Sequence, residues 1–150
     1  MSVVKFDDTD RRIIGELTRN GRLSFAELSR RVNLSPPAVA ERVQRLERSG
    51  VITGYRAEID PRALGYPLTA IVRVRPAPGQ LPKIPDIAAG IPEVGECHRI
   101  TGEDCFYLTL HLRSIDELSM TLDRFLVYGE TTTSLINATP VSRRDPPVPE

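Results

Sequence analysis

The sequence predicts an α+β protein of two small domains, because two different patterns follow each other along its 150 residues. In the first third, apolar residues recur at helical spacing behind polar capping residues. In the second half, strand-like alternation and two helical stripes come in the order βαββαβ. Aspartate, proline and glycine between positions 60 and 67 separate the two patterns. We therefore expect domains at residues 1–60 and 68–142, a linker at 61–67, and a disordered tail at 143–150.

Capping residues predict three helices in the first domain. Asp7 or Asp8 can cap a helix that ends at the Asn-Gly pair near position 20. Ser24 and Glu27 fit a capping box, which starts a second, short helix. Ser35 is a good N-cap for a third helix, and the two prolines after it occupy the first helical positions, where a proline loses no hydrogen bond. The adjacent prolines therefore mark the start of a helix.

A small hairpin completes this domain, because residues 51–59 read as two short strands around a Thr-Gly turn. Three helices, a tight turn between the last two, and a hairpin describe a winged helix-turn-helix, whose third helix enters the major groove of DNA. At about 100° per residue, Val39, Val43 and Leu46 face the core. A neighbouring outward face groups Ala38, Glu41, Arg42 and Arg45.

The charge distribution also points to double-stranded DNA as the partner. The formal net charge is zero, yet seven arginines and only three acidic residues lie between positions 22 and 56. Arg42 and Arg45 could pair with guanine edges, whereas Arg48 is better placed for phosphates. The candidate DNA-binding residues are Ser24, Ser35, Pro37, Ala38, Glu41, Arg42, Arg45, Arg48 and Arg56. The alternatives are a merely solvated arginine face and a helix-turn-helix that binds protein.

The second domain is expected to be ferredoxin-like, with both helices on one face of its sheet. The expected strands are 68–75, 94–101, 105–113 and 131–141, and the expected helices follow Leu81 and a capping box of Ser114 with Glu117. Leucines alternate with polar residues in the third strand, so the leucine side should meet the helices. A second subunit is the simplest cover for the other side, and we expect a homodimer.

Several classes of protein are excluded. No segment approaches the roughly 20 apolar residues of a membrane-spanning helix, and the N-terminus lacks an apolar signal core. We expect a cytoplasmic protein without a membrane partner. Cys97 and Cys105 are the only cysteines, too few for a disulfide framework or an all-cysteine zinc site. In a reducing compartment both should be small buried side chains. No metal, cofactor or catalytic residue is expected.

The stretch SFAELSRRVNLSPPAVAERVQRLERSGVITGYRAEIDPRALG resembles the DNA-binding half of the Lrp/AsnC, or feast/famine, transcriptional regulators. VGECHRITGEDCFYLTLHLRS and, further on, DRFLVYGETTTS resemble their ligand-binding domain. The resemblance runs from about Phe6 to Val141 in the same order. It implies a transcriptional regulator that binds DNA as a dimer or an assembly of dimers, often an octamer. It also implies an effector, typically an amino acid, bound at interfaces between the regulatory domains.

The resemblance also implies an effector site. The family's Gly-Asp/Glu-x-Asp loop matches at Gly102 and Glu103, but Cys105 stands where the second aspartate is usual, and Asp104 lies one place earlier. The candidate effector-binding residues are Gly102, Glu103, Asp104, Thr131, Thr132, Thr133 and Ser134. Carboxylates there could hold an effector's ammonium, and hydroxyls its carboxylate. The alternative is that the first three only form a turn and the last four only form a strand.

An enzyme is the main competing hypothesis. Sirohaem decarboxylases resemble this family in build and use a pocket lined by histidine and basic residues. The groups that could serve here are His98, His111, Arg73, Arg99 and Arg113. A histidine in a half-buried strand is more often a packing or interface residue, and no Ser/His/Asp set or phosphate-binding glycine loop is present. We therefore expect a regulator and not an enzyme.

Overall fold

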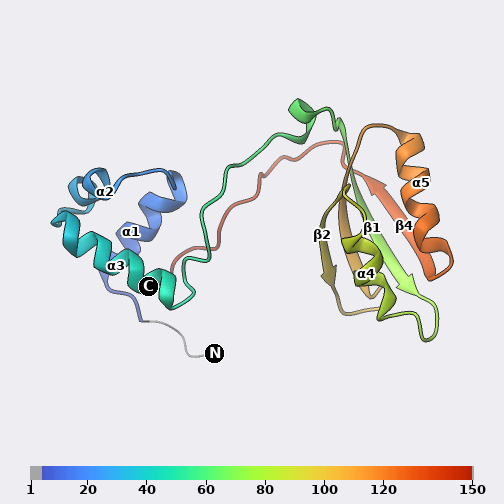
Figure 1. The fold of residues 1–150 in the computed structure, drawn as a ribbon, viewed down its shortest axis with the longest axis horizontal. Coiled ribbons are helices and arrows are strands. Elements are labelled where there is room, and N and C mark those ends of the chain that lie inside the picture. Colours follow the sequence, from blue (N-terminus) through green and yellow to red (C-terminus); the bar gives the residue numbers. More distant parts are fainter. Residues whose placement is uncertain (1–4, 150) are drawn as a thin grey trace. The chain divides into compact units, whose positions relative to one another are not determined.

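The chain folds into two compact units in the computed structural model, which describes residues 5–149 (Figure 1). The first unit combines residues 5–58 with residues 142–149, and the second is Ile59–Val141. The chain therefore leaves the first unit, builds the second and returns. Residues 143–149 of the expected tail carry no helix or strand. Their end contacts the first helix, since Arg11 Nε donates to the carbonyl oxygen of Pro149 at 2.8 Å.

The first unit contains three helices: α1 (Asp8–Arg19), α2 (Phe25–Val32) and α3 (Pro36–Arg48). The predicted capping residues are confirmed at all three starts. Asp7 caps α1 in a reciprocal box with Asp10, and Ser24 does the same for α2 with Glu27. Ser35 accepts a hydrogen bond from the Ala38 amide at 3.4 Å, with prolines in the first turn of α3.

Buried aliphatic side chains hold these helices together. α2 and α3 are joined by a short turn in which Asn33 has a left-handed φ of 57°, a conformation that asparagine tolerates. The core of the unit consists of Ile13, Leu28, Val32, Val39, Val43 and Leu46, all at most 2% exposed. Each such side chain contributes roughly 1.5–3 kcal/mol by leaving water. The core therefore fixes which side of α3 faces outward.

The predicted hairpin at residues 51–59 is wrong, because the structure assigns no strand there. The amides of Val51 and Ile52 both donate to the carbonyl oxygen of Leu46, at 3.0 and 3.1 Å, and so close the end of α3. Their side chains pack against the first core. Tyr55 then donates from its hydroxyl to Glu47 at 3.0 Å. Burial and this hydrogen bond raise the pKa of Tyr55 to about 12. The segment is thus bound to α3 and does not pair with itself.

The second unit has the expected ferredoxin-like order of elements. A short 3₁₀ turn (Pro61–Leu64) precedes β1 (Leu68–Pro76), α4 (Lys83–Ala89), β2 (Val94–Arg99), β3 (Phe106–Leu112), α5 (Ile115–Leu126) and β4 (Gly129–Leu135). The sheet order is β2-β3-β1-β4, and every neighbouring pair is antiparallel. This is the arrangement that the βαββαβ pattern predicts.

Two local predictions in this unit need correction. β4 ends at Leu135 and not at residue 141. The Ile136 amide still donates to the carbonyl oxygen of Thr69 at 2.8 Å, but β1 begins at Leu68, so the ladder cannot extend to residue 141. The capping box at Ser114 is only half formed. Its hydroxyl accepts from the Glu117 amide at 3.2 Å, but the Glu117 carboxylate accepts from the backbone and side chain of Arg113 instead.

The two faces of the sheet differ as predicted. Ala70, Val72 and Val74 of β1 and the even-numbered residues of β3 are buried with one side of α4 and α5, represented by Ile84 and Phe125. The opposite face, here called the open face, carries Thr69, Ile71, Arg73, Arg75, Tyr107, Thr109 and His111. These side chains are half-buried or exposed. Within residues 5–149, no helix has the length and apolar character needed to cross a bilayer.

Candidate nucleic-acid interface and effector site

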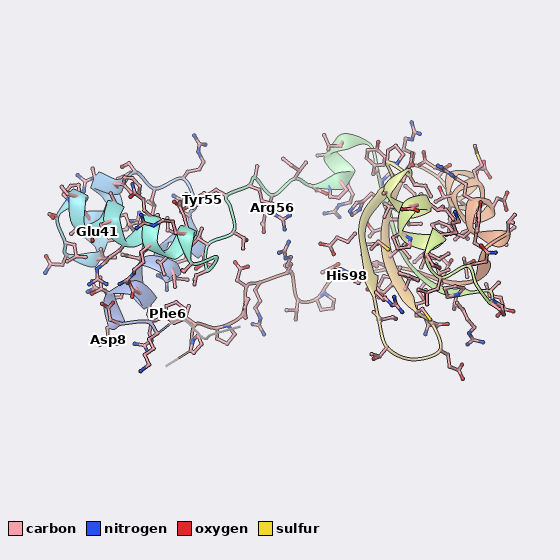
Figure 2. The ribbon with its side chains drawn as sticks, turned by 60° about the horizontal axis from the view of Figure 1, so that its bottom comes forward. Phe6, Asp8, Glu41, Tyr55, Arg56 and His98 are labelled. Carbon is pink, nitrogen blue, oxygen red and sulfur yellow. The ribbon has the colours of Figure 1, made fainter. Side chains whose placement is uncertain are left out.

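The outward side of α3 is set by its core residues. Val39, Val43 and Leu46 are buried, and at about 100° per residue the opposite side of the helix lies near four other positions. These positions, here called the outer stripe, are Pro37, Glu41, Gln44 and Arg48, and all four are exposed. Glu41 marks the stripe in Figure 2. Among the described residues, none of the three polar ones has a side-chain hydrogen bond or an ion pair. The outer stripe is thus available to a partner.

Arg42 and Arg45 lie on another side of α3, against the start of α1. Arg42 donates to Asp7 at 2.6 Å and to Asp10 at 2.9 Å, and Arg45 donates to both carboxylate oxygens of Asp10 at 2.6 Å. Asp10 is only 1% exposed. The hydrogen bonds that Arg42 donates to Asp7 and Asp10 raise the pKa of Arg42. The hydrogen bond from the Asp10 amide, followed by that from Arg42, lowers the pKa of Asp7. Two carboxylates and two guanidinium groups thus form one neutral cluster.

This placement differs from the expected outward position of these two arginines. Position 42 adjoins the core position Val43 and faces α1, so its side chain meets the carboxylates there instead of solvent. Sequence reasoning assigned Asp7 only a capping role and missed Asp10, because a contact between two helices is not visible in the spacing within either. It also missed Gln44, although the angular position opposite the core would have identified it.

The other candidate DNA contacts occupy varied positions. The hydroxyls of Ser24 and Ser35 are exposed but serve as helix caps. Ala38 is half-buried, and Arg56 is exposed in the extended segment after α3 (Figure 2). Exposed arginines without an ion pair among the described residues of this unit include Arg22, Arg30, Arg48 and Arg56. They leave the first unit with positive charge beyond its neutral cluster.

The two expected effector segments lie on either side of β1. Gly102 has a φ of +110°, which favours glycine and shapes the turn between β2 and β3. From this turn, Glu103 contacts Arg75 at 2.8 Å, while Asp104 lies 3.5 Å from Arg73 and 3.6 Å from Arg75. Sequence reasoning did not include either arginine in the effector site. The turn therefore presents carboxylates that are already paired within the chain.

The β4 candidates divide between the two faces of the sheet. Thr132 pairs with Arg73 and Ser134 with Ile71, so both lie on the open face. Thr131 and Thr133 alternate with them and lie on the core side. The structure thus brings Thr132 and Asp104 to the same arginine of β1, Arg73, with Glu103 at the neighbouring Arg75. Guanidinium, carboxylate and hydroxyl groups together match the two charged ends of an amino acid.

Family comparisons agree with this arrangement. Residues 6–53 match the model for winged helix-turn-helix DNA-binding, and residues 69–146 match the model for the Lrp/AsnC ligand binding domain. The chain belongs to the Lrp/AsnC family. It is therefore a DNA-binding transcriptional regulator and not an enzyme, since the curated relatives of this family are named as transcriptional regulators.

Individual members of the Lrp/AsnC family are similar over nearly the whole chain. The HTH-type transcriptional regulator LrpC of Bacillus subtilis is 34% identical over 133 residues, which cover 89% of this chain and 92% of the relative. The solved structure of LrpC covers 93% of this chain and all of its own, with a TM-score of 0.88. A feast or famine regulatory protein from M. tuberculosis, solved with L-methionine, is 35% identical, covers 96% of this chain and all of its own, and has a TM-score of 0.88.

Other reactive groups of this Lrp/AsnC chain do not converge. His98 on β2 (Figure 2) contacts Glu96 at 3.3 Å, while His111 on β3 contacts Thr69 at 3.3 Å. Within residues 5–149, no three histidine, cysteine, aspartate or glutamate residues are grouped to hold a metal. The expected burial of both cysteines is wrong for Cys97, which is exposed because β2 is an edge strand.

Proposed function

We propose that this Lrp/AsnC chain is a cytoplasmic, sequence-specific regulator whose DNA binding responds to an amino acid. The observation that carries the proposal is the exposed outer stripe of α3, which presents polar side chains on the side opposite the core. A helix of this kind fits the major groove, and the exposed arginines around it fit phosphates. Ser24, Ser35 and Arg56 are proposed as contacts at the edges of the groove.

The effector site is proposed at the turn of Gly102, Glu103 and Asp104 together with residues 131–134. Support comes from the charged groups that meet there and from the M. tuberculosis relative that was solved with L-methionine. The ammonium of an amino acid would replace an arginine as the ion-pair partner of Glu103 or Asp104. Its carboxylate would bind the arginine released by that exchange, beside the hydroxyl of Thr132.

We further propose a homodimer formed through the open face, able to assemble to an octamer. The dimer presents two α3 helices to a pseudo-palindromic site, and the effector shifts the assembly. Thr109→Arg, on the open face, should give a monomer in light scattering after size-exclusion chromatography. Met120→Arg on α5, where the residue is 71% exposed, is the matched control and should keep the wild-type mass. A dimeric Thr109→Arg variant would contradict this interface.

Fluorescence anisotropy of the full chain on its own upstream DNA tests the function, with a salt series and each amino acid added in turn. We expect tight binding that weakens steeply with salt, because phosphate contacts release counterions. One amino acid should shift the affinity, and DNA should alter the affinity for that amino acid by the same factor. Arg48→Ala should weaken binding to specific and random DNA alike. Binding that no amino acid shifts would refute the effector assignment.

A second variant isolates the effector turn. Gly102→Gln adds a side chain at a positive φ, so it should distort the turn and remove the amino-acid response. Basal DNA binding should remain, since the turn belongs to the second unit. A full response in this variant would show that the effector binds elsewhere.

A further inference from the structure

We propose that Gln44 is the base-reading residue at the centre of α3 and that Asp10 is a positioning residue that holds Arg42 and Arg45 away from the bases. This inference rests on the proposed function, in which α3 enters the major groove. It identifies which side chains of that helix carry specificity.

The first step is the direction of the outer stripe. Its ends, Pro37 and Arg48, are about 16 Å apart along the helix at a rise of 1.5 Å per residue. The major groove is about 12 Å wide. A helix inclined across it therefore brings the ends of the stripe to the groove walls, where phosphates lie. The middle of the stripe, Glu41 and Gln44, reaches the base edges.

The second step is the chemistry of those two central residues. A carboxylate only accepts hydrogen bonds, so Glu41 can bind a base amino group, most commonly that of cytosine, but cannot make a two-hydrogen-bond pair with a base edge that also accepts. The amide of Gln44 both donates and accepts, which is the pattern that pairs with N6 and N7 of adenine. Gln44 is exposed and has no side-chain hydrogen bond among the described residues, so it gives up no such internal partner when it binds.

The third step is the binding of Arg42 and Arg45 to Asp10, which keeps both guanidinium groups inside the protein's own ion pairs. Asp10 is 1% exposed, and three of its contacts come from Arg42, Arg45 and the Asp7 amide, the last at 3.2 Å. If either guanidinium moved to a base, this buried carboxylate would lose a charged partner in a poorly hydrated place, which is strongly unfavourable. Arg45 is 53% exposed and keeps other N–H groups for a phosphate while it stays bound to Asp10.

Asp10 therefore acts on DNA through the orientation of α3. Its carboxylate closes the capping box of α1 and at the same time holds one side of α3 through two guanidinium groups. These contacts add to the buried core residues of α3 and hold the helix firmly in the rotation that the core sets. In that rotation Gln44, and not Arg42, faces outward.

The test begins with selection of the tightest-binding site from a random DNA library by the full chain. Affinities of wild type, Gln44→Ala and Arg42→Ala are then measured by anisotropy on this site, on random DNA, and on copies in which each A·T pair is changed to G·C, and each G·C pair to A·T, one at a time. One good amide–adenine pair is worth about 5- to 150-fold in affinity. We expect Gln44→Ala to lose that factor on the selected site and to lose nothing on random DNA.

The decisive measurement is the dependence on single base pairs. Wild type should discriminate at one A·T pair per half-site, and Gln44→Ala should no longer do so there. Arg42→Ala should lower the melting temperature, since it breaks the cluster, yet keep the wild-type ranking of base pairs. Asp10→Asn tests the positioning role. With Gln44 intact, it should weaken binding to the selected site more than binding to random DNA. In a variant that already carries Gln44→Ala, it should cause little further loss of affinity for the selected site.

Different results distinguish a failure of the Gln44 assignment from a failure of the proposed DNA-binding function. If wild type binds tightly and Gln44→Ala retains full discrimination, the assignment of Gln44 is overturned while DNA binding stands. The same holds if Arg42→Ala alone loses discrimination at a G·C pair. Selection of no DNA sequence at all by the wild type would overturn the proposed function and this inference together. An unchanged melting curve for Gln44→Ala shows that its effect on binding does not arise from unfolding.

Discussion

Gly129 begins β4 beside the end of β1, and replacing it by alanine should destabilise the second unit. A Cβ atom at this position would collide with the carbonyl oxygen of Arg75 and lie 2.8 Å from Cα of Pro76. Both neighbours are backbone atoms of the paired strand, so no side-chain rotation can relieve the overlap. The ends of the two strands must move apart.

The size of the effect follows from this separation. Overpacking of this kind costs about 1–3 kcal/mol, and a lost ladder hydrogen bond adds roughly 0.5–1.5 kcal/mol. We expect Gly129→Ala to lower the free energy of unfolding by about 2–4 kcal/mol. For a unit of this size, each kcal/mol shifts the melting temperature by roughly 4–8 °C, so a decrease of about 8–32 °C is expected.

Calorimetry and circular dichroism of the full chain measure this change, and Gly15→Ala is the matched control. Gly15 lies inside α1 with no atom within 4 Å of an added Cβ. The same substitution should therefore stabilise the first unit by about 0.5–1 kcal/mol through helix propensity. If Gly129→Ala melted within about 2 °C of wild type, the close approach of β1 and β4 would be refuted.

Three further predictions concern packing, capping and pH. Phe125→Ala should remove about 3–5 kcal/mol from the free energy of unfolding in urea, because its side chain is 0% exposed; a loss below about 1 kcal/mol would contradict that burial. Ser24→Ala should cost about 1 kcal/mol and speed hydrogen exchange at the Glu27 amide, its capping partner; unchanged exchange would rule out the cap. Hydrogen bonds from the amides of Asp10 and Ser24, respectively, lower the pKa values of Asp7 and Glu27 in the folded protein. The stabilisation from these carboxylates is therefore present above their ordinary pKa values, 3.8 for Asp7 and 4.5 for Glu27, and is lost as pH falls through the lower pKa values of the folded protein. NMR titration midpoints at or above those ordinary values would contradict this.

Short-range patterns predicted most of the fold. The caps at Asp7, Ser24 and Ser35 depend on residues three positions apart, and the alternation in β3 depends on a period of two. Such signals are visible in one sequence without knowledge of tertiary contacts. The hairpin at 51–59 failed because the carbonyl of Leu46 takes the amides that a ladder would need.

The candidate sites were harder to predict, because their geometry depends on contacts between elements. The helical spacing of α3 predicts an outward position for Arg42, and only the packing of α1 against α3 brings Asp10 to it. Likewise, the two effector segments were found by resemblance, but Arg73 and Arg75 lie on the strand between them in space. Residues distant in sequence completed both sites, and no periodicity within one segment reports such partners.

The return of the chain to its first unit has a consequence for synthesis. Residues 59–141 are continuous, so the second unit can fold as soon as it has left the ribosome. The three helices of the first unit emerge earlier, but Arg11 meets the carbonyl of Pro149 only when the last residues have been made. A fragment that stops at residue 58 therefore lacks part of its own unit, whereas a fragment of residues 59–141 does not.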